Sequence, residues 1–299
     1  MKLNKQHSLF SLSITLILCL FSTLFAEDME LIDDFGENPG HLRMYVHVPT
    51  VTEREKPMPL VLILHGSWQT AKVLAKASGF NKLADSLKFI ALYPDQPFYN
   101  NLLTSFSFYI PGKMRKDAGE TASIRHMINY ACDTYPVDTN RIFITGMSAG
   151  GAMSNVMLNA YPSLFAAGAL FAAPSNLYED INPRRDPDLR VAVIHGRHDL
   201  TVPFRHAIKI EKQWREYFGL DEEALVTENY LGHAFLTLSM RPAFGLPRLL
   251  RLDLDNTGHI LLVDVGKGLK QGGQYTLFTQ DRDFHLPYWI CEFFGLTSE

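Results

Sequence analysis

The pentapeptide Gly-Met-Ser-Ala-Gly at residues 146–150 constrains the fold more than any other stretch of the chain. Residues 141–145 before it are β-branched and aromatic, which is typical of a short buried strand. Residues 151–160 after it are mostly small or straight-chained, which favours a helix. A serine between glycines at a strand-to-helix turn is the nucleophile-elbow pattern. Ser148 is therefore a candidate nucleophile, and the N–H of Ala149, at the start of the helix, is a candidate oxyanion donor.

The first 26 residues differ from the rest of the chain. Lys2 and Lys5 precede an apolar run over residues 9–26, and acidic residues follow. This layout is typical of a signal peptide cleaved after Ala26, so we expect a secreted or periplasmic protein that does not stay membrane-bound. An uncleaved membrane anchor is the alternative, because Leu24 is larger than the residue usual at that position of a cleavage site.

Composition limits the function of the remaining residues, 27–299. With 46% hydrophobic and 20% charged residues among 299, the chain can bury a large core. No repeat, low-complexity run or Pro-rich linker divides it, so we expect one catalytic domain over 27–299. The net charge is −4, and it falls to −6 when Lys2 and Lys5 are removed. Nucleic acid is therefore not an expected partner, and the oligomeric state stays open.

Apolar runs alternate with helical patterns along this domain. We expect strands at 41–49, 58–66, 89–94, 141–145, 166–173 and 189–196, and a hairpin from 235–240 and 247–254 turning at 244–245. We expect helices at 71–87, 151–160, 206–218 and 286–294, and one opened by a capping box from Asp117 to Glu120. Strands that alternate with helices predict an α/β fold, a mainly parallel sheet with helices on both faces.

Partners for Ser148 are expected where strands end at the ligand edge of such a sheet. His-Gly-Ser follows the strand at 58–66, so the N–H of Ser67, with that of Gly66 as an addition, could join Ala149 in an oxyanion hole. Asp199 follows the strand at 189–196 and could orient a catalytic histidine. An ordinary strand-end turn is the alternative for the His-Gly pair.

The histidine of a triad in this chain order comes last, so three residues compete. His259 follows the final predicted strand in a Gly-containing loop that could bring its ring over Ser148. His285 opens a helix and is expected to be a capping or surface residue, and His233 precedes a hairpin strand. We predict His259. His195 and His198 lack further ligands at useful spacing, so no metal and no cofactor are expected.

Five stretches in combination carry a family resemblance: 64–71, 92–95, 119–124, 141–153 and 195–203. They are similar to the polyhydroxybutyrate depolymerase family and the related feruloyl and acetylxylan esterases. The resemblance implies an α/β-hydrolase fold, a secreted serine esterase and a triad of Ser148, Asp199 and His259. Many extracellular members have Cys at the position of Ser67 and a Cys-Trp segment near 105–109, and this chain has neither.

The predicted activity is hydrolysis of an ester through an acyl-enzyme. Aromatic residues are expected to line the cleft and favour an uncharged acyl or aryl ester; those chosen for substrate binding are Trp68, Phe106, Phe108 and Tyr109. The resemblance favours hydroxyalkanoate esters of the polyhydroxybutyrate type, with a feruloyl or acetylxylan ester as the alternative. Soluble oligomers are expected rather than crystalline polymer, because the chain holds no separate polymer-binding module. A peptidase, an acyltransferase and a non-catalytic binding protein are further alternatives.

Two cysteines, Cys132 and Cys291, follow the predicted cleavage site. They fall on predicted helices that right-handed crossovers place on opposite faces of the sheet. Because a disulfide needs Cα atoms within about 7 Å, we expect two free, buried thiols.

Overall fold

The computed structural model describes residues 29–50, 56–175, 188–242 and 247–297. The predicted signal peptide, 1–26, lies outside these residues, so its cleavage stays a prediction. Ten strands form one sheet in the order β1-β2-β4-β3-β5-β6-β7-β10-β9-β8. Their bounds are β1 Glu30–Ile32, β2 Arg43–His47, β3 Met58–Leu64, β4 Ile90–Asp95, β5 Val137–Met147, β6 Ala167–Phe171, β7 Arg190–Gly196, β8 Leu225–Glu228, β9 Leu236–Pro242 and β10 Pro247–Leu254.

The middle of the sheet is parallel, as the sequence predicted. Strands β4, β3, β5, β6, β7 and β10 run in one direction, while β1 and β2 at one edge and β9 and β8 at the other are added antiparallel. Strands β3, β4, β6 and β7 are almost entirely buried, which explains their near-continuous apolar sequences. All carboxyl ends of these strands therefore meet at one edge, where the candidate site residues follow them.

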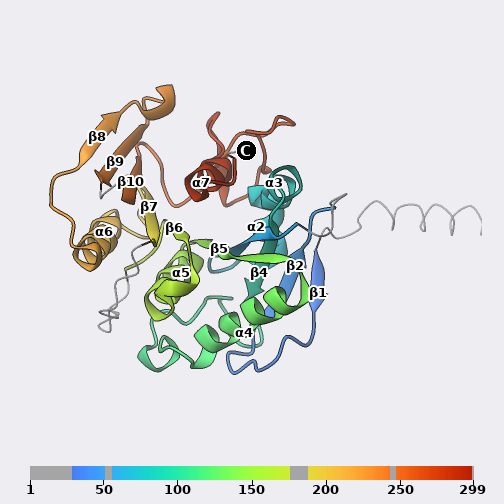
Figure 1. Cartoon of the computed structure of the whole chain (residues 1–299). Coiled ribbons are helices and arrows are strands. Elements are labelled where there is room, and N and C mark those ends of the chain that lie inside the picture. The colour runs from blue at the N-terminus through green and yellow to red at the C-terminus, as the bar shows by residue number, and fades with distance from the viewer. Residues whose placement is uncertain (1–28, 51–55, 176–187, 243–246, 298–299) are drawn as a thin grey trace, which may run out of the picture.

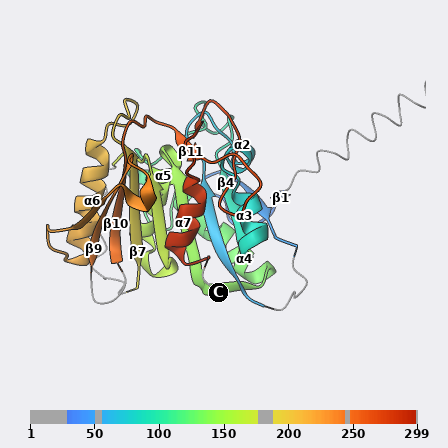
Figure 2. The ribbon, with the colours of Figure 1, turned by 90° about the horizontal axis from the view of Figure 1, so that it is seen from above.

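Helices cover both faces of the sheet, which completes the predicted α/β architecture (Figure 1). On one side lie α2 Ala71–Ser78, α3 Phe80–Leu87 and α7 Leu286–Phe294; on the other lie α4 Gly119–Thr134, α5 Ala149–Ala160 and α6 Arg205–Phe218. In the view from above, α7 crosses the middle of the sheet (Figure 2). Each layer has its own apolar core, with Trp289 of α7 in one and Trp214 of α6 in the other.

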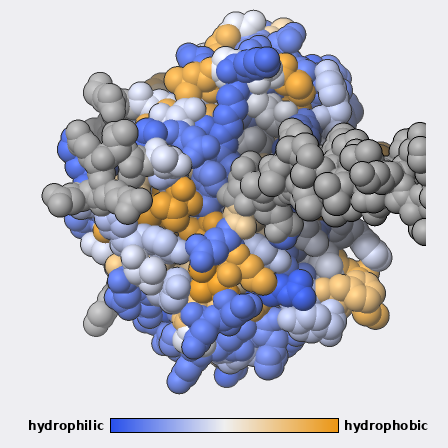
Figure 3. Space-filling view, turned by 90° about the vertical axis from the view of Figure 1, so that its right-hand side faces the viewer, coloured by the Kyte–Doolittle hydropathy of each residue, from blue (hydrophilic) through white to orange (hydrophobic). Residues whose placement is uncertain are grey.

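Smaller elements complete the fold. They are the 3-10 turns η2 Pro111–Lys113, η3 Pro162–Leu164 and η4 Tyr230–Gly232, and a two-stranded sheet of β11 Leu261–Val263 and β12 Thr279–Asp281. The face that carries the β1 edge of the main sheet is a mosaic of hydrophilic and hydrophobic side chains (Figure 3). None of the helices within the described residues is long and apolar enough to span a bilayer.

One predicted helix is two helices in the structure. The range 71–87 divides at Gly79, whose φ of 75° ends α2 in a left-handed cap. A side chain there would also place its Cβ 2.6 Å from the backbone N of Gly273. The glycine thus sets the angle between α2 and α3 and lets the loop around Gly273 pack against it.

The predicted capping box at the start of α4 is wrong. The N-cap is Ala118, and no side chain caps the helix. Asp117 has a φ of 58° and accepts a hydrogen bond from Tyr161 Oη at 3.0 Å. The side chain of Glu120 points into the interior and is only 1% exposed, because it accepts hydrogen bonds there from Gln96 and Ser107.

The C-terminal part of the sheet holds one strand more than the sequence predicted. The hairpin of β9 and β10 is antiparallel as expected, but its turn at 244–245 lies outside the described residues. Strand β8 then adds to β9 with all four of its residues exposed. An exposed edge strand has little apolar pattern, and so its sequence gives little signal.

The two cysteines are free, as predicted. Cys291 of α7 is buried in the core on one side of the sheet, and Cys132 of α4 packs against the core on the other. Cys132 is only partly buried, which corrects the expectation that both thiols are buried.

Candidate active site

Ser148 sits on the tight turn between β5 and α5. Its φ of 56° and ψ of −120° are strained for a residue with a side chain, and its N–H donates to Phe171 O at 2.9 Å. A Cβ on Gly146 would lie 2.5 Å from Gly150, and a Cβ on Gly150 would lie 2.2 Å from Leu64 O. Both glycines are therefore required by close approach of the backbone, as the elbow pattern demands.

Asp199 and His259 are in direct contact. The Nδ1 of His259 donates to Asp199 Oδ2 at 2.7 Å, and Asp199 Oδ1 accepts from the N–H groups of Thr201 and Val202 at 2.9 and 2.7 Å. Burial opposes ionisation of Asp199, but the hydrogen bonds from His259 and Val202 outweigh it and lower the pKa of Asp199. A buried carboxylate on Nδ1 leaves Nε2 of His259 as the proton acceptor.

The loops that carry Asp199 and His259 are packed tightly against one another. The N–H of His198 donates to Thr257 O at 3.0 Å, and a Cβ on Gly196 would lie 2.4 Å from the same oxygen. Ser148 follows the parallel strand β5 at the same edge of the sheet. Its Oγ makes no hydrogen bond to His259 within the described residues, and such bonds in ligand-free enzymes often form only with substrate.

Residues 65–69, which we term the oxyanion loop, lie next to Ser148. A Cβ on Gly66 would lie 3.3 Å from Ser148 Cβ. The N–H of Gly66 donates to Gln69 Oε1 at 2.9 Å, and that of Trp68 donates to Leu103 O at 2.8 Å. Of the three successive N–H groups, only that of Ser67 has no partner among the described residues. This leaves Ser67, and not Gly66, free to meet an oxyanion.

The predicted substrate-binding aromatics divide into surface and interior residues. Trp68 and Tyr109 are 69% and 54% exposed, so they can meet a ligand. Phe106 is fully buried with its ring centroid 5.0 Å from that of His65, and it belongs to the core. Phe108 is partly buried and packs against the same core. The prediction for Phe106 is therefore wrong, because an aromatic residue in a loop sequence can equally face inward.

The two histidines around the loop after β7 do not converge. His195 is buried and donates from Nε2 to Val202 O at 2.7 Å, while His198 is exposed. Burial lowers the pKa of His195 and keeps it neutral.

Among the described residues, the carboxylates of Asp264, Asp281 and Asp283 lie within 4.8 Å of one another. Asp281 already accepts hydrogen bonds from Val265 N–H and Tyr275 Oη, so we assign no metal there.

His285 and His233, the two alternatives to His259, make structural contacts. His285 is the N-cap residue of α7, although its side chain makes no capping bond, and it is not on the surface: it is 4% exposed, and its Nε2 donates to Ser78 O at 2.8 Å. Burial lowers the pKa of His285 to about 4. His233 precedes β9, as expected, and packs against the rings of Phe235 and Phe284.

One residue near the site was not found from the sequence. Arg282 reaches the loop that carries His259: its Nη1 donates to Asp255 O and Thr257 Oγ1, each at 3.0 Å. Its guanidinium also stacks 3.9 Å from the ring centroid of Phe235. His259 and Arg282 lie 23 positions apart in the chain, so no local sequence pattern reveals this contact.

The chain is similar to known esterases. The family model described as Esterase PHB depolymerase matches residues 42–178. The chain is 30% identical over 292 residues to poly(3-hydroxyalkanoate) depolymerase C of Paucimonas lemoignei, which covers 89% of this chain and 69% of that protein. It is 29% identical over 196 residues to acetylxylan esterase A of Aspergillus oryzae, covering 65% of this chain and 62% of that one.

The fold is also similar to that of a solved esterase structure. An acetyl xylan esterase from Aspergillus awamori superposes with a TM-score of 0.72 at 20% identity, over 90% of this chain and 99% of that structure. Together, these relatives and the α/β-hydrolase architecture show that the protein is a serine carboxylic-ester hydrolase. The chain belongs to the esterase PHB depolymerase family.

Proposed function

We propose that the hydrolase works through a triad of Ser148, His259 and Asp199. The observation that carries the proposal is the 2.7 Å hydrogen bond from His259 Nδ1 to Asp199 Oδ2. This pair lies at the same edge of the sheet as the turn that holds Ser148. Asp199 selects the tautomer of His259 whose Nε2 can take a proton, and it stabilises the imidazolium that results.

The reaction proceeds in two halves. Ser148 Oγ attacks the ester carbonyl while His259 takes its proton, and the N–H groups of Ser67 and Ala149 bind the oxyanion. The bond to the alcohol breaks, and His259 returns the proton to the departing alcohol. Water, activated by the same histidine, then hydrolyses the acyl group from Ser148.

Hydroxyalkanoate esters are the proposed substrates, as soluble oligomers. In sequence, the depolymerase from Paucimonas lemoignei is similar over 89% of the chain, whereas acetylxylan esterase A of Aspergillus oryzae is similar over 65%. Exposed apolar side chains also gather on the loops after β3 and β4: Trp68, Phe98, Tyr99, Leu102 and Tyr109. The hydrogen bond from Trp68 N–H to Leu103 O holds these two loops together. An apolar surface suits an uncharged acyl chain.

The triad is tested by kinetics on a soluble short-chain ester. Ser148→Ala and His259→Ala should lower kcat by several orders of magnitude, and Asp199→Asn should do so through the wrong tautomer of His259. His233→Ala is the matched control and should retain activity. Normal turnover by His259→Ala would refute the assignment of the base.

The substrate is tested with two esters of similar solubility, a hydroxybutyrate trimer and a feruloyl ester. We expect the trimer to have the higher kcat/KM. A clear preference for the feruloyl ester would reject the depolymerase assignment and leave the triad unaffected.

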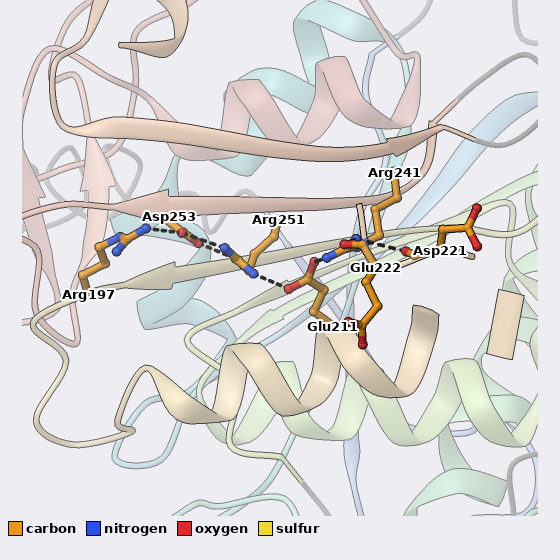
Figure 4. A network of polar contacts seen from close by, with 7 residues as sticks. All are labelled: Arg197, Glu211, Asp221, Glu222, Arg241, Arg251 and Asp253. Atoms are coloured by element: carbon orange, nitrogen blue, oxygen red, sulfur yellow. Dashed lines mark hydrogen bonds and ion pairs between the residues drawn. The ribbon is translucent and has the colours of Figure 1, made fainter. Parts of the chain in front are cut away.

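A carbohydrate ester is the second candidate, and a polar cavity favours it. The cavity, of about 490 Å³, lies over β8–β10 and is lined by Arg197, Val226, Glu228, Asn229, Ala234, Thr237, Ser239, Arg251 and Asp255. Its charges are balanced, and the ion pairs of Arg197 and Arg251 with Asp253 hold the two guanidinium groups in place (Figure 4). Fixed donors and acceptors without net charge suit hydroxyl groups. Faster hydrolysis of an acetylated xylo-oligosaccharide than of the hydroxybutyrate trimer would favour this candidate.

We propose that the protein is secreted and that its signal peptide is cleaved after Ala26. Its mature form should begin at Glu27. Mass spectrometry of the exported protein measures this terminus, and a protein that retains residues 1–26 in the membrane would support the anchor instead.

A further inference from the structure

A buried series of polar side chains connects the start of α4 with the oxyanion loop. Its members are Glu120, Gln96 and His65, which are 1%, 1% and 0% exposed. They come from three separate segments: Glu120 from α4, Gln96 from the residue after β4, and His65 from the residue after β3. Buried polar groups are costly unless they are hydrogen-bonded, so the contacts of these three residues define their role.

His65 controls the orientation of one peptide unit. The N–H of Gln96 donates to His65 Nε2 at 3.0 Å, so the ring carries its proton on Nδ1 and donates to Gly66 O at 2.8 Å. The carbonyl of Gly66 and the N–H of Ser67 belong to the same planar peptide. A hydrogen bond that holds this carbonyl therefore sets the direction of the Ser67 N–H, the donor without a partner among the described residues.

Glu120 anchors the other end of the series. Its Oε1 accepts from Gln96 Nε2 at 2.7 Å, and its Oε2 accepts from the N–H of Ser107 at 2.7 Å. Both neighbours are donors, so only a side chain with two acceptor oxygens satisfies them. No ion pair to Glu120 is found in the described part of the chain. Burial raises the pKa of Glu120, so its charge is kept there at a cost in free energy.

We propose that Glu120 is a positioning residue for the oxyanion hole, acting through Gln96 and His65 on the peptide between Gly66 and Ser67. This inference rests on the proposed triad and on Ser67 as an oxyanion donor. The negative carboxylate holds Gln96, Gln96 presents its N–H to His65, and His65 holds the carbonyl of Gly66. Each step is a hydrogen bond between groups with no access to water.

A positioning role and a purely structural role predict different kinetics. An oxyanion donor interacts with charge that develops in the transition state, so its misplacement lowers kcat and leaves KM nearly unchanged. A side chain that serves stability alone lowers the melting temperature and leaves kcat of the folded protein intact. The two roles are therefore separable at a temperature well below the melting transition.

The test is Glu120→Gln in the full chain, with a soluble short-chain ester. The amide has the same shape but must turn an NH₂ group toward one of the two donors, Gln96 Nε2 or Ser107 N–H. We expect kcat to fall by about tenfold with KM changed by less than about twofold. Affinity for a trifluoromethyl ketone, whose adduct with Ser148 carries an oxyanion, should fall by the same factor as kcat/KM.

The matched control is Glu211→Gln. Glu211 is also buried, at 4% exposed, but it lies on α6 and pairs with Arg241 and Arg251. Its substitution should lower the melting temperature without changing kcat. Should Glu120→Gln be insoluble, Gln96→Met breaks the same series, keeps the backbone N–H that His65 accepts, and should give the same loss of kcat.

Unchanged kcat and ketone affinity in folded Glu120→Gln, while Ser148→Ala is inactive, would overturn the inference and leave the triad standing. Equal losses in Glu120→Gln and Glu211→Gln would overturn it as well, because they would show a general effect of destabilisation. Activity that persists in Ser148→Ala would instead contradict the proposed function itself.

Discussion

At the scale of single residues, the candidate site depends on backbone geometry that only small side chains allow. Ser148 adopts a positive φ because Gly146 and Gly150 leave room for β5 and α5 to meet within one turn. This part of the site could be predicted from the sequence, since the residues that make the turn are adjacent in the chain. The Glu120 series could not, because its contacts join residues that lie 13 to 31 positions apart.

Gly150→Ala tests the steric requirement at the elbow. The added Cβ would lie 2.2 Å from Leu64 O, so strand β3 or helix α5 must move. We expect the free energy of unfolding to fall by about 3 kcal/mol, with loss of ester hydrolysis. Denaturant unfolding measures the first effect. Gly112→Ala is the control, because no atom lies within 4 Å of a Cβ at that position. Equal stability of the two variants would contradict the close approach.

His285 predicts part of the acid sensitivity of the fold. Burial lowers the pKa of His285 from 6.5 to about 4, so the unfolded chain binds a proton at this residue before the folded protein does. The contribution of His285 to stability is therefore present above pH 6.5 and is lost as the pH falls to about 4, at a cost of about 3 kcal/mol. His285→Gln can keep the donor to Ser78 O without titrating.

Denaturant unfolding between pH 7 and pH 4 measures this difference. The variant should lose less stability than the wild type on acidification, while His198→Gln, at an exposed position, serves as the control. A pH dependence that is the same in wild type and His285→Gln would show that His285 does not titrate as its burial implies.

At the scale of elements, local patterns located most helices and strands but missed what other segments impose on them. The helix at 71–87 breaks because the loop around Gly273 packs against Gly79, some 190 residues away. The acidic residue at the start of α4 suited a capping box, yet Ser107 and Gln96 draw Glu120 inward. Strand β8 forms by pairing with β9, although its own side chains are exposed. Each of these three differences from the prediction arises from a contact with a distant segment of the chain.

Arg282 gives a prediction for the loop between β10 and β11, which carries His259. Its Nη1 donates to Asp255 O and Thr257 Oγ1 while the planar guanidinium stacks on the ring of Phe235, and the ammonium of a lysine cannot reproduce that stacking. We expect Arg282→Lys to lower kcat by about tenfold, because a small displacement of His259 misaligns proton transfer. Steady-state kinetics measures it. Arg215→Lys, which alters a surface ion pair with Glu222, is the control. Equal kcat in both variants would exclude a role in holding the loop.

At the scale of the whole molecule, the sheet separates two apolar layers that carry different functions. The layer of α2, α3 and α7 packs with the strands on either side of His259, whereas α4 carries Glu120, α5 begins at the elbow, and α6 contributes Glu211 to the ion-pair series of Figure 4. The parallel sheet with helices on both faces followed from the alternation of strands and helices, and the α/β-hydrolase fold from the family resemblance. The site combines strand ends from across this sheet, so its detailed geometry depends on the complete fold.

The two layers also keep the cysteines apart. Cys132 belongs to α4 and Cys291 to α7, on opposite faces of the sheet. Thiol titration of the denatured protein that lacks residues 1–26 should count two free thiols per chain. A count of zero would mean that the two helices lie on the same side, against the layered fold described above.

The central claim is that Ser148 is the nucleophile of an acyl-enzyme, and covalent labelling tests it most directly. An aryl phosphonate ester transfers its phosphonyl group to an activated serine and releases the aryl alcohol. Peptide mass spectrometry of the labelled protein should find one phosphonyl group, on Ser148, and none after the same treatment of His259→Ala over the same time. A label on another residue, or an unlabelled Ser148 in protein that still hydrolyses esters, would contradict the account.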